Sequence, residues 1–131
     1  MNKMKQPITF ISVTEHAKEQ MDFYVDVFPN TTIQSVTYYE NYPERVLNGQ
    51  LDLNGILIYF LEMGPENPVT NGWNFSLFAE MDSEEEFDRI FSALSAKGVV
   101  IMGPEAAGIF QKVTWLTDKF GVTWQLVFGG K

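Results

Sequence analysis

The sequence carries one pattern of hydrophobic and turn residues twice, at a constant distance. Four pairs of corresponding residues, among them Met21 with Phe87 and Gly55 with Gly121, are each separated by 66 residues. The stretch NGILIYFL at 54–61 therefore aligns with FGVTWQLV at 120–127, although few residues are identical. A fixed period of this kind indicates that one structural unit occurs twice along the chain.

One amphipathic helix is predicted in each copy. Apolar residues recur at i, i+3, i+4 and i+7 in both segments, which places them on one helical face. They are Met21, Tyr24, Val25 and Phe28 in the first copy, and Phe87, Ile90, Phe91 and Leu94 in the second. Ser83 and Glu86 match a capping box at the start of the second helix, and Gly98 marks its end.

Strand-like segments surround each helix in the same order. A short run precedes each helix, at 8–13 and at 73–79, and three further runs separated by turn residues follow it. Both copies are therefore predicted to be β-α-β-β-β modules, at about 6–64 and 72–129, in an α+β protein. A chain of 131 residues has the length of a single domain, so we expect residues 1–131 to form one domain from two modules.

The charge balance restricts the kinds of partner. The net charge is −8, from 17 acidic against 9 basic residues, and no basic run interrupts it. Nucleic acid and anionic membrane surfaces are therefore not expected as partners. No cysteine is present, which excludes disulfides and thiolate ligands, and no long apolar segment occurs. We expect a cytoplasmic protein.

The segments FYVDVFPNTTI, GPE, DSEEEFDRIFSAL and above all WLTDKFGVTWQLV, in this order, resemble the PhnB-like branch of the vicinal oxygen chelate superfamily. Glyoxalase I, extradiol dioxygenases and bleomycin-resistance proteins belong to this superfamily, and the resemblance covers nearly the whole chain. It implies a glyoxalase/bleomycin resistance-like fold, with two curved sheets around a cavity and the helices on their outer faces. It also implies a bacterial homodimer.

In the metal-dependent members of the superfamily, four side chains reach the cavity from the first and last strands of each module. The corresponding positions lie near Thr9 or Phe10, at Tyr59, near Trp73 and at Gln125. A catalytic divalent ion requires imidazole or carboxylate ligands, which these positions lack. We therefore expect no bound metal and no cofactor. The one histidine, His16, starts the first helix and is expected to be a solvated or capping residue.

Strand alternation predicts which residues line the cavity. Gln125 shares a strand face with Thr123 and Val127, whereas Trp124 lies on the opposite face and is expected in the core. The resemblance implies a small-molecule site lined by Thr9, Ile11, Tyr59, Trp73, Phe75, Trp115 and Gln125, with Tyr38, Tyr39 and Tyr42 as candidates for its wall and mouth. Each of these aromatic residues could equally serve packing alone. Asp118 and Lys119 are expected to form a charged turn.

Two main functions remain open on this basis. The first is a metal-free protein that binds a small, partly apolar molecule in an aromatic cavity. The second is a metal-independent enzyme, similar to a lyase or isomerase, in which Tyr59, Gln125 and Glu62 would be catalytic; Glu62, three residues past Tyr59, should face the other way. Drug sequestration is a third possibility. Proteins of this branch are often labelled demethylubiquinone methyltransferase-like, but no glycine-rich loop for a methyl donor occurs.

Overall fold

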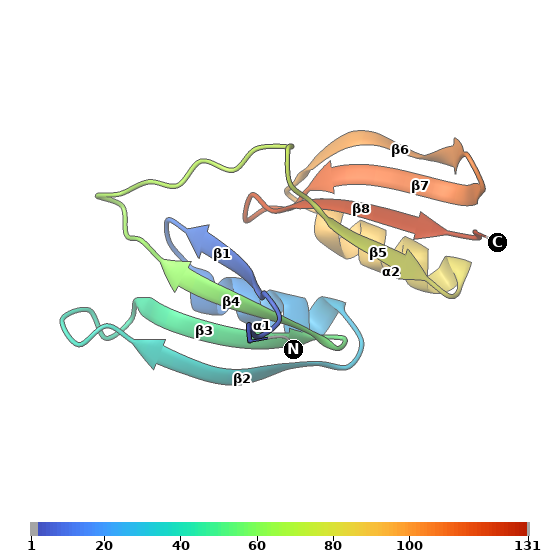
Figure 1. Ribbon diagram of the computed structural model, residues 1–131. Coiled ribbons are helices and arrows are strands. Elements are labelled where there is room, and N and C mark those ends of the chain that lie inside the picture. The colour runs from blue at the N-terminus through green and yellow to red at the C-terminus, as the bar shows by residue number, and fades with distance from the viewer. Residues whose placement is uncertain (1–2, 131) are drawn as a thin grey trace. The chain divides into compact units, whose positions relative to one another are not determined.

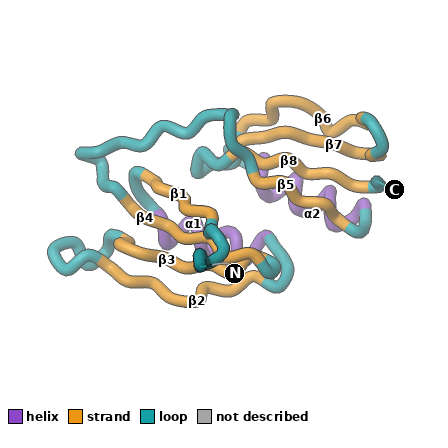
Figure 2. The backbone as a smooth tube through the Cα atoms, viewed as in Figure 1, coloured by secondary structure: helices purple, strands orange, loops and turns teal. Residues whose placement is uncertain are grey.

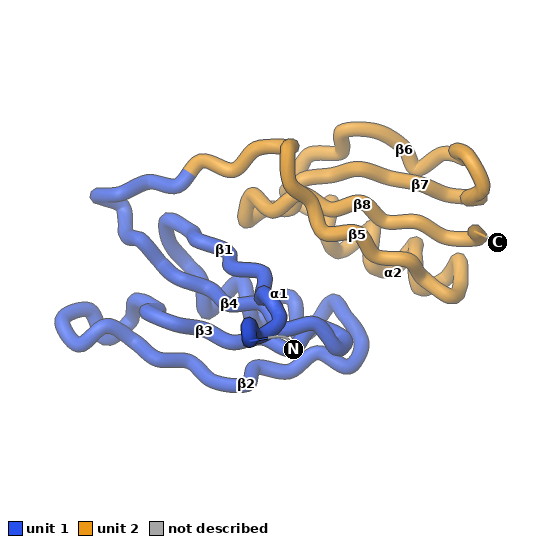
Figure 3. Tube along the Cα trace, viewed as in Figure 1, with its two compact units in different colours: residues 1–69 blue, residues 70–131 orange. Residues whose placement is uncertain are grey.

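The computed structural model describes residues 3–130. The chain divides into two compact units, and the boundary in the sequence falls between Val69 and Thr70 (Figure 3). Each unit contains four strands and one helix (Figures 1 and 2). The first unit comprises β1 (Thr9–Val13), α1 (Ala17–Val27), β2 (Thr31–Tyr38), β3 (Val46–Leu53) and β4 (Ile56–Glu62). The second comprises β5 (Leu77–Met81), α2 (Glu84–Ser95), β6 (Val99–Ala107), β7 (Phe110–Thr117) and β8 (Thr123–Phe128).

The two sheets have the same topology. Their strand orders are β1-β4-β3-β2 and β5-β8-β7-β6. The first and last strands of each unit pair in parallel, and the remaining neighbours pair antiparallel. Both sheets are open, and neither closes into a barrel. The predicted α+β class and the β-α-β-β-β order of both modules are therefore confirmed. Neither helix has the length and apolar character needed to cross a membrane.

Helix α1 packs on one face of the first sheet. Its residue Tyr24 is fully buried, with ring centres 6.3 Å from Phe60 on β4 and 6.1 Å from Phe28. Met21 lies above Gly49 on β3, where a Cβ atom would sit 2.5 Å from the methionine sulfur. The helix therefore approaches the sheet closely at this point because Gly49 has no side chain.

Helix α2 packs against β7 and β8 in the second unit. Phe87 and Leu94 of the helix are fully buried, as is Leu126 of β8, and Trp124 is 1% exposed. The expectation that Trp124 belongs to the core is confirmed. The side chains that form this core are Phe87, Ile90, Leu94, Leu116, Trp124 and Leu126.

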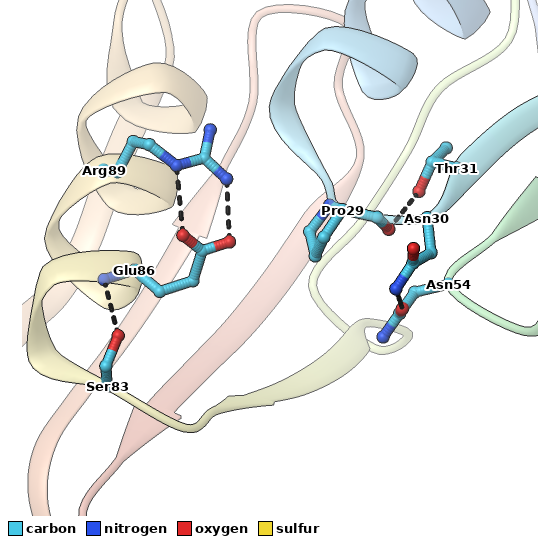
Figure 4. A network of polar contacts seen from close by, with 7 residues as sticks. All are labelled: Pro29, Asn30, Thr31, Asn54, Ser83, Glu86 and Arg89. Atoms are coloured by element: carbon cyan, nitrogen blue, oxygen red, sulfur yellow. Dashed lines mark hydrogen bonds and ion pairs between the residues drawn. The ribbon is translucent and has the colours of Figure 1, made fainter.

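The N-terminus of α2 is capped by a serine (Figure 4). The Ser83 hydroxyl accepts a hydrogen bond of 3.2 Å from the backbone N–H of Glu86, as the capping pattern predicts. The Glu86 carboxylate binds the Arg89 guanidinium at 2.8 and 3.1 Å and does not complete the reciprocal half of a capping box. In the first unit, the amides of Asn30 and Asn54 meet at 3.3 Å where two turns approach one another (Figure 4).

Asp118 lies at the predicted charged turn, and its carboxylate is buried there, which the sequence analysis did not predict. It is 3% exposed, and one carboxylate oxygen accepts hydrogen bonds from the backbone N–H groups of Phe120 and Val122, at 2.9 and 3.1 Å. Its other oxygen accepts from the indole Nε1–H of Trp124 at 2.9 Å. The residue that corresponds by the repeat is Asp52, which accepts from the backbone N–H of Gly55 at 2.8 Å. An aspartate thus organises the same hairpin turn in both units.

Candidate functional site

A row of three side chains crosses the face of the first sheet that α1 does not cover. Phe10 of β1 and Gln50 of β3 both pair with Tyr59 of β4. Paired residues on neighbouring strands project to the same side. Their neighbours Ile58 and Phe60 are fully buried on the opposite, helix-covered side. Phe10 remains 53% exposed and meets the Tyr59 ring edge-on, with 6.5 Å between centres.

A corresponding row crosses the open face of the second sheet. Phe78 of β5 and Trp115 of β7 both pair with Gln125 of β8. The Trp115 ring lies 5.8 Å from Trp73, at an interplanar angle of 57°. Phe78 and Trp73 are each 57% exposed. Gln125 therefore lies on the open face, between two aromatic side chains, as the sequence predicts for its orientation.

The two rows contain the same chemical components in a different order. Across the strands, the first row reads phenylalanine, tyrosine and glutamine, whereas the second reads phenylalanine, glutamine and tryptophan. Each row therefore offers an exposed ring, an amide and an aromatic ring with a hydrogen-bond donor. Such a surface suits a ligand that is partly apolar and carries polar atoms.

The indole N–H of Trp115 is a buried donor without an acceptor. Among the described residues no hydrogen-bond partner lies within reach of this atom. A buried donor of this kind costs about 1 to 3 kcal/mol unless a ligand or water satisfies it. The Gln125 amide, its neighbour on the open face, likewise makes no side-chain hydrogen bond within residues 3–130. Neither group has a protein hydrogen-bond partner among the described residues.

The segment that carries Trp73 is tied to the same face. The hydroxyl groups of Thr117 and Thr123 lie 3.2 Å apart on neighbouring strands, and the Thr123 hydroxyl also approaches the Gly72 carbonyl oxygen at 3.4 Å. This contact holds the chain just before Trp73 against the open face. It helps to explain why the Trp73 ring lies next to Trp115.

The predicted register of the first strand is wrong by one residue. Thr9 and Ile11 were expected on the open face, but Ile11 packs against the buried cluster of Val13, Ala17 and Val46 under the helix. Thr9 has the same facing as Ile11 because alternate residues of a strand project to the same side. The pairing with Tyr59 identifies Phe10 as the residue that belongs to the open face.

The fifth strand begins later than the sequence predicts. Trp73 and Phe75 precede β5, which starts at Leu77. Phe10 and Phe78 are 68 residues apart, whereas Met21 and Phe87 of the two helices are 66 apart, so the second copy has two fewer residues between its first strand and its helix. Phe78 therefore takes the position that was expected near Trp73.

Glu62 lies away from Tyr59, as strand alternation predicts. It is 9% exposed, and its Oε1 atom accepts hydrogen bonds from the backbone N–H groups of Ala17 and Val46, at 3.4 and 3.3 Å. This carboxylate accepts a hydrogen bond from the first residue of α1, on the helix side of the sheet. It cannot act as a base together with Tyr59, which weakens the case for a metal-independent enzyme.

The four strand positions that hold a metal in the superfamily are occupied here by Phe10, Tyr59, Phe78 and Gln125. Two phenyl rings, a phenol and a neutral amide do not fit a divalent cation, which needs imidazole or carboxylate ligands. Within the part of the chain that the structure describes, no three histidine, aspartate or glutamate side chains could together hold a metal ion.

Gln50 and Phe78 were missed by the sequence analysis, whereas Phe10 was one of two candidates for its position. The correspondence of Phe78 to Phe10 is hidden because the connection from the first strand to the helix is two residues shorter in the second copy. Gln50 lies in VLNGQLDL, where alternation of polar and apolar residues marks Asn48, Gln50 and Asp52 as one face. That alternation was the available signal for Gln50.

Comparison with known proteins identifies a matching family and structures with the same architecture. The family model described as 3-demethylubiquinone-9 3-methyltransferase matches residues 5–127. A PhnB protein from Bacillus cereus, described as a 3-demethylubiquinone-9 3-methyltransferase, has a similar structure with a TM-score of 0.84. The two chains are 28% identical, and the match covers 95% of this chain and 99% of the other. No curated protein sequence matches this chain.

Two further structures share the fold at lower sequence identity. Protein PA1353 from Pseudomonas aeruginosa is 18% identical, with a TM-score of 0.83 over 98% of this chain and 100% of its own. The fosfomycin resistance protein FosX from Listeria monocytogenes is 12% identical, with a TM-score of 0.68 over 100% of this chain and 96% of its own. Both similarities concern the fold alone, that is, the arrangement of the helices and strands.

Proposed function

Because the chain belongs to the family described as 3-demethylubiquinone-9 3-methyltransferase, within the PhnB-like branch of the vicinal oxygen chelate superfamily, we propose that it binds a small, partly apolar molecule without a metal ion. The unsatisfied indole N–H of Trp115, beside Gln125 on the open face of the second sheet, carries this proposal. The ligand brings a hydrogen-bond acceptor to this donor and lays an apolar ring against Trp73.

Methyl transfer, which the family description names, is not part of this proposal. A nucleotide-containing methyl donor calls for a glycine-rich turn between a strand and a helix, where backbone N–H groups can approach the ligand closely. The turns here read TEH at 14–16 and DS at 82–83, so neither contains glycine. The residues at these turns do not fit such a cofactor.

A matched pair of probes tests the binding proposal. Acetophenone and ethylbenzene have similar shapes, but only the ketone carries a strong acceptor for the Trp115 N–H. In a two-dimensional ¹H–¹⁵N NMR titration, acetophenone should shift the Trp115 indole resonance saturably and ethylbenzene should shift it much less. Trp124 is an internal control, because its N–H already binds Asp118. In Trp115→Phe, where the side-chain amide of Gln125 serves as the reporter, the preference for the ketone should be lost.

Two results would contradict the proposal. One is the absence of any saturable shift at Trp115 across a panel of aromatic ketones. The other is an equal response of Trp115 and Trp124, which would indicate nonspecific binding. Stoichiometric metal in protein purified without chelators would contradict the metal-free part independently.

We further infer a homodimer that acts in the bacterial cytoplasm. Large apolar side chains remain exposed on the edge strands of both sheets, with Phe10 at 53% and Phe78 at 57%. Such residues favour contact with another surface. Light scattering coupled to gel filtration should give twice the mass of 15.0 kDa. A mass of one chain at all concentrations would rule the dimer out.

A further inference from the structure

A pocket separate from these sheet faces lies in the first unit, where the loop between β2 and β3 lies near the N-terminus of α1. Its volume is about 490 Å³, within the range of small-molecule sites. None of the residues of the Phe10, Tyr59 and Gln50 row lines it. The charged and aromatic side chains that do so are Glu15, His16, Tyr42, Glu44, Arg45 and Glu62.

Glu62 is the buried charged group of this pocket. Only 9% of the residue is exposed, and its Oε1 atom accepts both backbone hydrogen bonds, from Ala17 and Val46. The hydroxyl of Tyr39 donates to the Glu62 carbonyl oxygen at 3.0 Å and fixes the end of β4. Among the described residues no hydrogen bond or ion pair reaches Oε2 of Glu62. A carboxylate at this depth is costly without a counter-charge.

Arg45, the one lysine or arginine that lines this pocket, is engaged elsewhere. Its Nη1 atom lies 2.7 Å from a carboxylate oxygen of Glu66, and its guanidinium carbon lies 4.0 Å from the centre of the Tyr42 ring. These two contacts hold the guanidinium against the loop wall. Arg45 therefore shapes the pocket, and the Oε2 atom of Glu62 is left for another partner.

The charges of the lining favour a cation over an anion. Glu15, Glu44 and Glu62 contribute three carboxylates, and the charge of Arg45 is balanced by Glu66 outside the lining. The start of α1 would ordinarily attract an anion. Here the Glu62 carboxylate already occupies that position, so a second anion would be repelled.

We propose that this pocket binds a small organic molecule through an ammonium group, with Glu62 as the counter-ion. The ammonium donates to Oε2 of Glu62, and Glu15 and Glu44 add to the negative potential at the pocket. The apolar part of the molecule lies along the Tyr42 side of the pocket. The site is independent of the proposed ligand face around Trp115.

The backbone amides of Ala17 and Val46 are direct reporters of this site, because both donate to Glu62. In an NMR titration with butylammonium chloride, both amide resonances should shift saturably, and added salt should weaken the binding. The uncharged 1-butanol should leave them in place. Binding to Trp115 would appear at a different resonance, so failure here leaves the proposed function unaffected.

Two variants distinguish binding of butylammonium at the pocket from its general attraction to a negatively charged protein. Glu62→Gln keeps the shape of the side chain but removes its charge, and should weaken butylammonium binding by about tenfold or more. Glu85→Gln removes the same charge from the first turn of α2 and should leave the affinity unchanged. Circular dichroism verifies that both variants are folded.

Three outcomes would overturn the proposal. They are no saturable shift at Ala17 and Val46 in the unmodified protein, an equal shift with 1-butanol, and equal weakening by Glu62→Gln and Glu85→Gln. The first two use the unmodified chain, so the proposal can be rejected even if Glu62→Gln does not fold.

Discussion

The Asp118 carboxylate accepts a hydrogen bond of 2.9 Å from the indole N–H of Trp124, and both residues are almost completely buried. The same carboxylate accepts two backbone N–H groups of the β7–β8 turn. Removing it would take away an acceptor that three donors use. Asp118→Ala should therefore lower the free energy of unfolding by about 3 kcal/mol or more.

Asp52→Ala provides the matched control for this loss. Asp52 corresponds to Asp118 by the repeat, but within the described residues its side chain accepts one hydrogen bond, from Gly55, in an exposed turn. Its removal should cost about 1 kcal/mol. Urea denaturation followed by circular dichroism measures both changes, and equal losses would show that the Trp124 hydrogen bond is not what stabilises the second turn.

The two buried indole N–H groups of the second unit predict losses of stability of different size when tryptophan is replaced by phenylalanine. Trp124→Phe removes a hydrogen bond to a carboxylate and should cost about 2 to 3 kcal/mol. Trp115→Phe removes a donor that has no partner and should cost less than about 1 kcal/mol. Thermal or urea unfolding distinguishes them, and a larger loss at Trp115 would mean that its N–H is satisfied in solution.

Gly49→Ala should be destabilising although the backbone there is an ordinary strand. The added methyl group would lie 2.5 Å from the sulfur of Met21, which is fully buried. Overpacking of this kind costs about 1 to 3 kcal/mol. In a double-mutant cycle, Gly49→Ala should lower the free energy of unfolding by less in the Met21→Ala background than in the unmodified protein. Strictly additive losses would contradict the contact.

The ion pair between Glu86 and Arg89 predicts that stability decreases slightly as the pH falls into the acidic range. The hydrogen bond from Arg89 lowers the pKa of Glu86 below its ordinary value. A lowered pKa in the folded state stabilises the protein at pH values above the unfolded-state pKa. The contribution is lost as the pH falls through the folded-state pKa.

Carbon-13 NMR of the Glu86 carboxyl group measures this effect directly. Arg89→Gln should raise the pKa of Glu86 and flatten the acid limb of the stability curve. Because the pair is exposed, the expected change is only about 0.5 kcal/mol. An unchanged pKa in Arg89→Gln would assign the lowering to the helix N-terminus instead.

The module order and the second helix followed from the sequence because their causes are local. Phe87, Ile90 and Leu94 have helical spacing, and Ser83 supplies a cap that depends only on nearby backbone. The facing of Gln125 followed from alternation along β8. In these cases, one segment contains all the information that the prediction needs.

The errors concern relationships between distant segments. Ile11 was assigned to the open face, and only the pairing with β4 identifies Phe10 as the residue that lies there. The position of β5 differs because the second copy has two fewer residues between its first strand and its helix, in a connection that has no periodic signal.

The exchanged order of amide and aromatic side chain in the two rows means that the modules are no longer interchangeable. A ring that lies on Tyr59 would find its amide partner on the β3 side, whereas a ring on Trp115 finds it on β8, towards the outer strand β5. A molecule fitted to one row would have to be turned end over end to fit the other. Damage to one face is therefore not compensated by the other, despite the shared design.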